Sequence, residues 1–135
     1  QPHRMKFQPD QFGAAITGYG LGWIAIGGQR VQHSVVLRST GEWADGTCTR
    51  FDDLSPAHFA PLVETNPELV VFGSGNALRF PRQAWIRSLI EARIGVETMD
   101  TGAACRTYNI LAGEGRRVVA ALLVEPGMPD EDRLK

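Results

Sequence analysis

Hydrophobic and polar residues alternate through the first part of the chain, up to about residue 49. The alternation is clear in residues 23–26 and 31–37, and it is typical of strands, whose successive side chains point to opposite faces. Gly27-Gly28 separates the two runs and predicts a two-residue hairpin turn, because glycine accepts the positive φ that such turns require. A second turn is expected at Gly18-Tyr19-Gly20. This part of the chain is therefore predicted to form an antiparallel β meander.

After residue 55, apolar runs alternate with segments of helical periodicity. Ser55-Pro56 predicts the start of a short helix that Pro61 interrupts. Residues 69–72 are apolar throughout and predict a buried strand that ends in a tight loop. A helix is expected from about Pro81, with Gly95 as its left-handed terminator. The apolar face of this helix consists of Trp85, Ile86, Leu89 and Ile90.

The last third of the chain continues this order. Residues 96–99 predict a strand, a helix follows to about Ala112, and residues 118–124 are apolar at every position, as a strand buried on both faces requires. The order strand, helix, strand, helix, strand predicts parallel strands with helices on the faces of the sheet. We expect one α/β domain over residues 5–125 and a flexible tail over residues 126–135.

Composition limits the classes of function. The chain has 135 residues, 43% of them hydrophobic, and a net charge of -1 without any block of basic residues. This balance argues against nucleic-acid binding and against a membrane-surface patch, and no apolar run is long enough to span a membrane. Cys48 and Cys105 are too few and too far apart for a disulfide framework, which indicates a reducing compartment, the cytoplasm. The three histidines have no metal-ligand spacing, so we predict no metal site and no cofactor.

Two polar loops are the candidate binding elements. Gly73-Ser74-Gly75-Asn76 and Asp100-Thr101-Gly102 each follow a predicted parallel strand, and ligands bind at the carboxyl ends of such strands. If the two strands are neighbours, both loops line one cleft. The alternative is that the glycines only let the chain turn and that Asp100 or Thr101 only caps the helix.

The helix that begins near Asp100 places Gly102, Cys105, Arg106 and Asn109 on one outward stripe. Its predicted core face consists of Ala103, Ala104, Thr107, Tyr108, Ile110 and Leu111. Arg106 has the planar fork that binds a carboxylate or phosphate, or it pairs with a local carboxylate such as Glu114 or Glu97.

Cys105 is the candidate nucleophile on this stripe. Its place near a helix start beside Arg106 favours a lowered thiol pKa. No histidine is close in sequence to act as its base, so a buried structural cysteine is the better interpretation. The residues supply no complete catalytic set, and the glycine loop lacks the motifs of nucleotide-binding loops. The sequence therefore favours a non-enzyme.

The chain resembles a known family through residues 96–101, 103–111 and 114–116, which lead into an apolar strand, and through the strand that ends in Gly73-Ser74-Gly75. This is the domain-of-unknown-function family that includes the mitochondrial respiratory complex I assembly factor 3 and the adipogenesis-associated domain protein. The resemblance implies a single three-layer domain, with a mixed central sheet flanked by helices and an extra β element. The parallel βαβαβ half and the β meander agree with it.

The resemblance implies no established enzymatic activity. It implies a non-catalytic role with a protein partner, as in membrane-complex assembly. No arginine-rich leader of the mitochondrial kind precedes the domain, so we expect an uncharacterised bacterial member. The leading hypothesis is a binding or assembly domain that uses Gly73 to Asn76 and Asp100 to Asn109. The alternative is an enzyme or binder for a small anionic metabolite, with Arg106 holding the anion and Cys105 or Asp100 reacting. The oligomeric state stays open, and a homodimer is one option.

Overall fold

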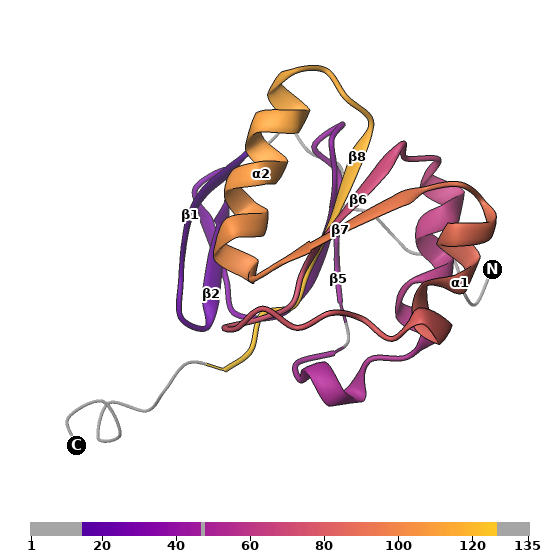
Figure 1. Ribbon diagram of the computed structural model, residues 1–135. Coiled ribbons are helices and arrows are strands. Elements are labelled where there is room, and N and C mark those ends of the chain that lie inside the picture. The colour runs from indigo at the N-terminus through magenta and orange to yellow at the C-terminus, as the bar shows by residue number, and fades with distance from the viewer. Residues whose placement is uncertain (1–14, 47, 127–135) are drawn as a thin grey trace.

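Two β-sheets and two α-helices make up the computed structural model, which describes residues 15–46 and 48–126 (Figure 1). The smaller sheet is antiparallel and contains β1 (Ile16–Gly20), β2 (Trp23–Ile26) and β3 (Gln29–Val31). The larger sheet has the order β5-β4-β8-β6-β7. Its strands are β4 (Val35–Arg38), β5 (Trp43–Asp45), β6 (Leu69–Gly73), β7 (Gly95–Met99) and β8 (Val118–Leu122). The helices are α1 (Gln83–Glu91) and α2 (Thr101–Gly113), with 3-10 turns η1 (Phe51–Asp53), η2 (Pro56–His58) and η3 (Ala60–Thr65).

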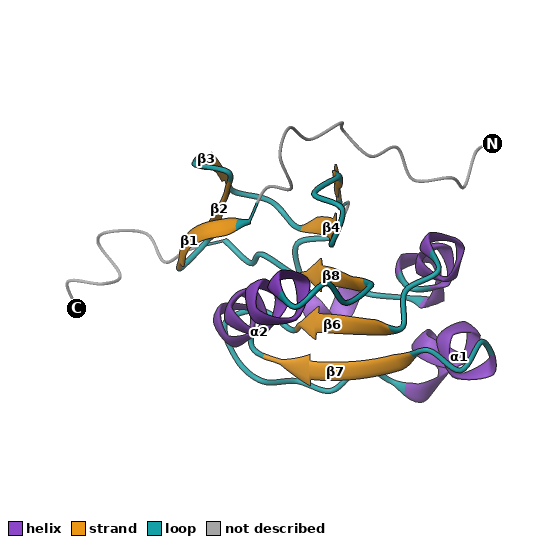
Figure 2. Ribbon diagram, turned by 90° about the horizontal axis from the view of Figure 1, so that it is seen from above, coloured by secondary structure: helices purple, strands orange, loops and turns teal. Residues whose placement is uncertain are grey.

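The larger sheet is the middle layer of three. On one face, α2 and the small sheet bury a cluster that includes Val71, Tyr108 and Ala120. On the other face, α1 and the 3-10 turns bury a cluster that includes Val70 and Leu89. Alternate residues of the central strands thus belong to different cores, and the views in Figures 1 and 2 agree with this layering. The predicted mixed three-layer α/β fold is confirmed.

The strand order explains why the helices lie on opposite faces. β6 is parallel to both β7 and β8 and lies between them. The connection from β6 to β7 and the connection from β7 to β8 therefore cross the sheet in opposite directions. Right-handed crossovers in opposite directions place their helices on opposite faces. Beyond the strand ends, the chain continues from β6 toward the α1 face and from β7 toward the α2 face. The carboxyl end of such a sheet is where a crevice forms in folds of this kind.

The predicted turns of the meander are right at one place and wrong at another. Gly27 and Gly28 form the two-residue hairpin turn, with φ of 56° and 85°. Residues 18–20 are not a turn but belong to β1, and the chain reverses at residues 21–22, where Gly22 has φ 78°. Small residues are needed in β1 because the ring of Trp23 lies across the strand. A Cβ on Gly20 would lie 2.8 Å from the ring carbon Cε2, which is too close.

The predictions for the middle helices need three corrections. The segment after Ser55 forms 3-10 turns, and Pro61 lies in the first turn of η3 instead of interrupting a helix. Ile90 is half exposed, so it is not part of the buried face of α1 that Trp85 and Leu89 form. Gly95 is the first residue of β7, and it is Arg93 that adopts the left-handed conformation after α1, with φ 61°.

The last strand ends at Leu122, two residues before the predicted end, although Leu123 and Val124 stay buried. Residues 127–135 of the predicted tail lie outside the described residues. Over the part of the chain that the structure describes, no helix is long and apolar enough to cross a membrane.

Candidate functional site

The loops that follow β6 and β7 are direct neighbours, as the cleft hypothesis requires. The two strands pair in parallel, with Gly73 opposite Met99. The amide of Gly75 donates to the Thr101 hydroxyl at 2.9 Å, and the amide of Thr101 donates back to the Gly75 carbonyl at 2.9 Å. The Thr101 hydroxyl also donates to the carbonyl of Leu123 at 2.6 Å. Thr101 therefore joins the ends of three parallel strands, and its hydroxyl accepts one hydrogen bond and donates another in doing so.

Gly73, Ser74 and Gly75 shape this end of the sheet. A Cβ on Gly73 would lie 2.9 Å from the Thr101 hydroxyl oxygen, so only glycine lets α2 pack this close. Ser74 is completely buried, donates to the Ala77 carbonyl at 2.7 Å and accepts from the Arg79 amide at 2.9 Å. Gly75 has φ +104°, a conformation that other residues rarely adopt. These three residues therefore determine the conformation and the packing of the loop that follows β6.

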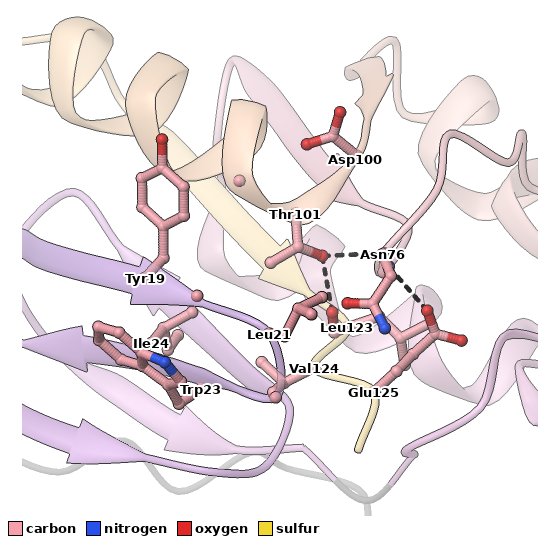
Figure 3. A pocket seen from close by; sticks show the side chains of 14 residues that line it. Tyr19, Leu21, Trp23, Ile24, Asn76, Asp100, Thr101, Leu123, Val124 and Glu125 are labelled. Carbon is pink, nitrogen blue, oxygen red and sulfur yellow. Dashed lines mark hydrogen bonds between the residues drawn. The ribbon is translucent and has the colours of Figure 1, made fainter. Parts of the chain in front are cut away.

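A pocket of about 260 Å³ lies between the β1–β2 hairpin and the strand ends (Figure 3). We call it the strand-end pocket. Its lining consists of residues 19–24, 75–76, 100–102 and 123–125. Figure 3 shows Tyr19, Leu21 and Trp23 on the hairpin side and Asn76 and Glu125 across from them. Four of the nine candidate residues line this pocket: Gly75, Asn76, Asp100 and Thr101.

The hairpin wall of the pocket was not foreseen among the candidate residues. Tyr19 is 39% exposed and Leu21 is 52% exposed, although both are large and apolar. Their places at a glycine-rich hairpin tip are visible in the sequence. Nothing local indicates that this tip lies against the loops of residues 75 and 100, because the contact joins distant parts of the chain.

Of the two candidate caps, Asp100 and Thr101, it is Asp100 that caps α2. Its Oδ1 accepts a hydrogen bond from the Ala103 amide at 2.8 Å. In Figure 3 its carboxylate points away from Leu21 and Glu125. The negative charge also lies at the positive end of the helix dipole, which stabilises both. The helix cap therefore accounts for an aspartate at position 100 without a further role.

Glu125 forms the far wall of the pocket and was also not foreseen. Its carboxylate accepts from the Asn76 amide at 2.7 Å. It also binds both terminal nitrogens of the Arg79 guanidinium, at 3.0 and 3.1 Å. The same guanidinium lies 5.6 Å from the centre of the Phe51 ring. Glu125 therefore ties the loop after β6 to the end of β8.

Arg106 is exposed, as predicted, but its partner is different from the predicted ones. Its guanidinium donates to the hydroxyl of Tyr19 and lies 5.6 Å from the centre of the Tyr19 ring. Among the described residues it forms no ion pair with Glu97 or Glu114. Arg106 thus connects α2 to the hairpin at the rim of the strand-end pocket.

Asn109 is held by the small sheet. Its Oδ1 accepts from the Ile16 amide at 3.0 Å, and its Nδ2 donates to the Ile16 carbonyl at 2.7 Å. This pair of bonds copies the pairing of a neighbouring strand at the first residue of β1. Asn109 is therefore an edge cap rather than a free binding group.

Cys105 does not belong to the outward stripe, because it is only 1% exposed. Burial raises its pKa to about 12, an effect that the nearby Arg106 opposes and Asp100 reinforces. The expected lowering of the thiol pKa is therefore wrong, and the interpretation as a buried structural cysteine is confirmed. The physical reason is that the small sheet packs against the side of α2 that a solitary helix would expose.

The predicted core face of α2 holds for Ala104 and Tyr108, which are buried, but not for Ile110, which is 62% exposed. Within the described residues, no three histidine, cysteine, aspartate or glutamate side chains lie close enough together to hold a metal ion.

The chain is similar to a known protein family and to several known proteins. The family model described as a protein of unknown function (DUF498/DUF598) matches residues 16–123. The human NADH dehydrogenase [ubiquinone] 1 alpha subcomplex assembly factor 3 is 33% identical over 119 residues, which cover 83% of this chain and 61% of that protein. An uncharacterized protein of Rhodobacter capsulatus is 32% identical over 112 residues, covering 83% of this chain and 86% of that protein.

A crystal structure of a protein from Bordetella parapertussis superimposes with a TM-score of 0.79 at 35% identity, covering 87% of this chain and 100% of that chain. The chain spans only about three fifths of the length of the human assembly factor. The family resemblance inferred from the sequence is confirmed.

Proposed function

Since this chain belongs to the DUF498/DUF598 family of proteins of unknown function, we propose that it is a non-catalytic binding domain that helps to assemble a protein complex. The strand-end pocket and its rim are the proposed partner surface. The human relative is named an assembly factor of NADH dehydrogenase, and this name supports an assembly-like role for the shared domain. The partner and the complex are proposals for this chain.

The observation that carries the proposal is the exposed apolar hairpin tip beside polar groups that are already bonded. Leu21 is 52% exposed and Tyr19 39% exposed, although Arg106 contacts the Tyr19 hydroxyl and ring. The Thr101 hydroxyl and Oδ1 of Asp100, by contrast, form internal hydrogen bonds. An apolar centre with tyrosine and arginine at its rim is typical of protein interfaces, whereas catalysis needs reactive groups that are free to act.

The alternative hypothesis is an enzyme that acts on a small anionic metabolite. The burial of Cys105 argues against its role as the nucleophile. Cys105 is buried and its thiol stays protonated at neutral pH, because its pKa is about 12. Asp100 is engaged as a helix cap. What remains of that hypothesis is anion binding by the exposed Arg106, which already donates to the Tyr19 hydroxyl.

The proposal is tested by affinity capture from the cells that make the protein. The tagged wild type is compared with Leu21→Ser and with Ile110→Ser, a matched control. Ile110 is also a large exposed aliphatic residue, but it lies on α2 and does not line the pocket. We expect Leu21→Ser to lose one set of partners that Ile110→Ser retains, with both variants folded by circular dichroism. Equal capture by all three proteins would contradict the proposed surface.

The bacterial and cytoplasmic origin inferred from the sequence stays a prediction, and the oligomeric state stays open, with a homodimer as one option. The single-domain limits at residues 5 and 125 are also proposed, and fractionation and limited proteolysis would test them. The similarity to the Rhodobacter capsulatus protein supports a bacterial source.

A further inference from the structure

The two sheets have four edge strands, and three of them are protected. β3 and β5 are only three residues long. The edge of β1 packs against α2, and its first residue, Ile16, is bonded by the Asn109 carboxamide. β7 is five residues long, and no other strand in the described residues pairs with its outer side. Figure 2 shows β7 as the outermost strand of the larger sheet.

An edge strand of this length presents unused hydrogen-bonding groups. The parallel pairing with β6 uses one side of the β7 backbone, so alternate N–H and C=O groups point outward. Such a row can accept a further strand, and natural proteins shield it when it serves no purpose. The residues of β7 are exposed or half-buried along the whole strand.

The two faces of β7 differ in chemistry. The register places Val96 beside Val70 and Thr98 beside Phe72, on the face that α1 covers. Val96 is partly buried against the cluster of Val70, Phe72 and Leu89 on this face. A strand added at this edge therefore meets apolar surface on the α1 side.

The other face carries a charge at the centre of the strand. Glu97 pairs with Val71 on the α2 side, is exposed, and forms no ion pair within the described residues. Antiparallel pairing of two copies of β7 with full overlap centres on residue 97 and sets Glu97 against Glu97. Like charges that face each other across strands are destabilising, and a register shift would give up part of the pairing. Glu97 thus disfavours a second copy and favours a basic residue.

We propose that the outer edge of β7 binds an extended segment of a partner protein by strand addition. The segment carries lysine or arginine opposite Glu97 and apolar, β-branched residues opposite Val96 and Thr98. The backbone bonds supply affinity, and the alternate side chains supply specificity. This surface is separate from the strand-end pocket, whose lining contains no residue of β7.

Two capped synthetic peptides test the proposal: acetyl-Thr-Thr-Val-Lys-Val-Thr-Thr-amide and the same peptide with glutamate in place of lysine. Each is titrated into the ¹⁵N-labelled full chain. We expect the lysine peptide to shift the amides of residues 95–99 and to bind about fivefold tighter than the glutamate peptide, the size that a reversed cross-strand charge pair supports. Glu97→Lys should invert the preference. Glu64→Lys makes the same charge change on η3 and should leave it unchanged.

Several results would overturn the proposal. One is the absence of shifts at residues 95–99 with either peptide, and another is equal binding of both peptides to the wild type. A wild-type dimer formed through residues 95–99, seen by sedimentation and by NMR, would assign the edge to a second copy instead. Leu21→Ser should bind the lysine peptide as the wild type does, so failure at the strand-end pocket and failure at this edge are distinguishable.

Discussion

Asn109 on α2 holds Ile16 on β1 through two hydrogen bonds, although 93 residues separate them. The side chain accepts from the backbone amide of Ile16 and donates to its carbonyl, so a helix takes the place of a neighbouring strand. This contact connects the small sheet to the three-layer domain. The contact also explains why α2 carries a polar residue at position 109, which the helical pattern alone suggests is a binding group.

Replacing Asn109 with leucine should lower the free energy of unfolding by about 1–2 kcal/mol, because both backbone groups of Ile16 lose a partner. Urea denaturation measures the change. Asn76→Leu removes an exposed carboxamide and should cost under about 0.5 kcal/mol. Hydrogen exchange at the Ile16 amide should accelerate only in the Asn109 variant. Equal costs for the two variants would show that Asn109 is not an edge cap.

Thr101→Val should destabilise the protein by about 2 kcal/mol. The change keeps the shape of the side chain but leaves the Gly75 amide and the Leu123 carbonyl without their partner in a buried position. Thr101→Ser keeps the hydroxyl and should cost clearly less. Thr107→Val, at a half-buried position of the same helix, is the matched control for the change of residue type. If Thr101→Val unfolds at the same urea concentration as the wild type, the hydroxyl does not stabilise the strand ends.

The Cys105 thiol should resist alkylation in the folded protein up to about pH 11, because its pKa is about 12. The unfolded chain should react with the usual thiol pKa near 8.5. Iodoacetamide labelling across pH, read by mass spectrometry with and without urea, checks both statements. Labelling of the native protein with a midpoint near pH 8.5 would contradict the buried structural role.

The same difference in pKa predicts how stability depends on pH. The folded pKa of Cys105 lies above the unfolded one, so burial of the neutral thiol contributes its full stability below about pH 8.5. This contribution is lost as the pH rises from there toward 12, since only the unfolded chain releases the proton. Cys105→Ala should therefore lose less stability than the wild type between those pH values in urea denaturation. Parallel curves for the two proteins would show that the thiol is not the cause.

Glu125→Gln should loosen the loop after β6, because it replaces the bidentate ion pair with Arg79 by a weaker contact. We expect a loss of about 1 kcal/mol and faster amide exchange at Asn76. Glu42→Gln breaks the more exposed pair with Arg38 and should cost under about 0.5 kcal/mol. A Glu125 variant that keeps the Asn76 amide protected would show that this carboxylate does not hold the loop.

The elements that depend on neighbouring residues could be predicted well. The Asp100 cap, the Gly27-Gly28 turn and the apolar strand of residues 69–72 all rest on preferences within a few positions of the chain. The turn expected at residues 18–20 failed because glycine there accommodates the Trp23 ring rather than a reversal. Likewise, Gly95 begins a strand because the left-handed position falls on Arg93.

The sequence by itself determined the order of the strands from residue 69 onward, the two α-helices between them and the loops of residues 73–76 and 100–102 at strand ends, because periodicity, capping and turn preferences act locally. That these loops are neighbours follows from the pairing of β6 with β7, which only the tertiary structure shows. Only the tertiary structure decided the candidate site. A helical pattern shows which side of α2 is apolar, but not that a second sheet covers the adjoining side. That packing buried Cys105, bonded Asn109 and brought Tyr19 to Arg106. These outcomes depend on contacts between residues nearly the whole domain apart, and no local preference encodes them.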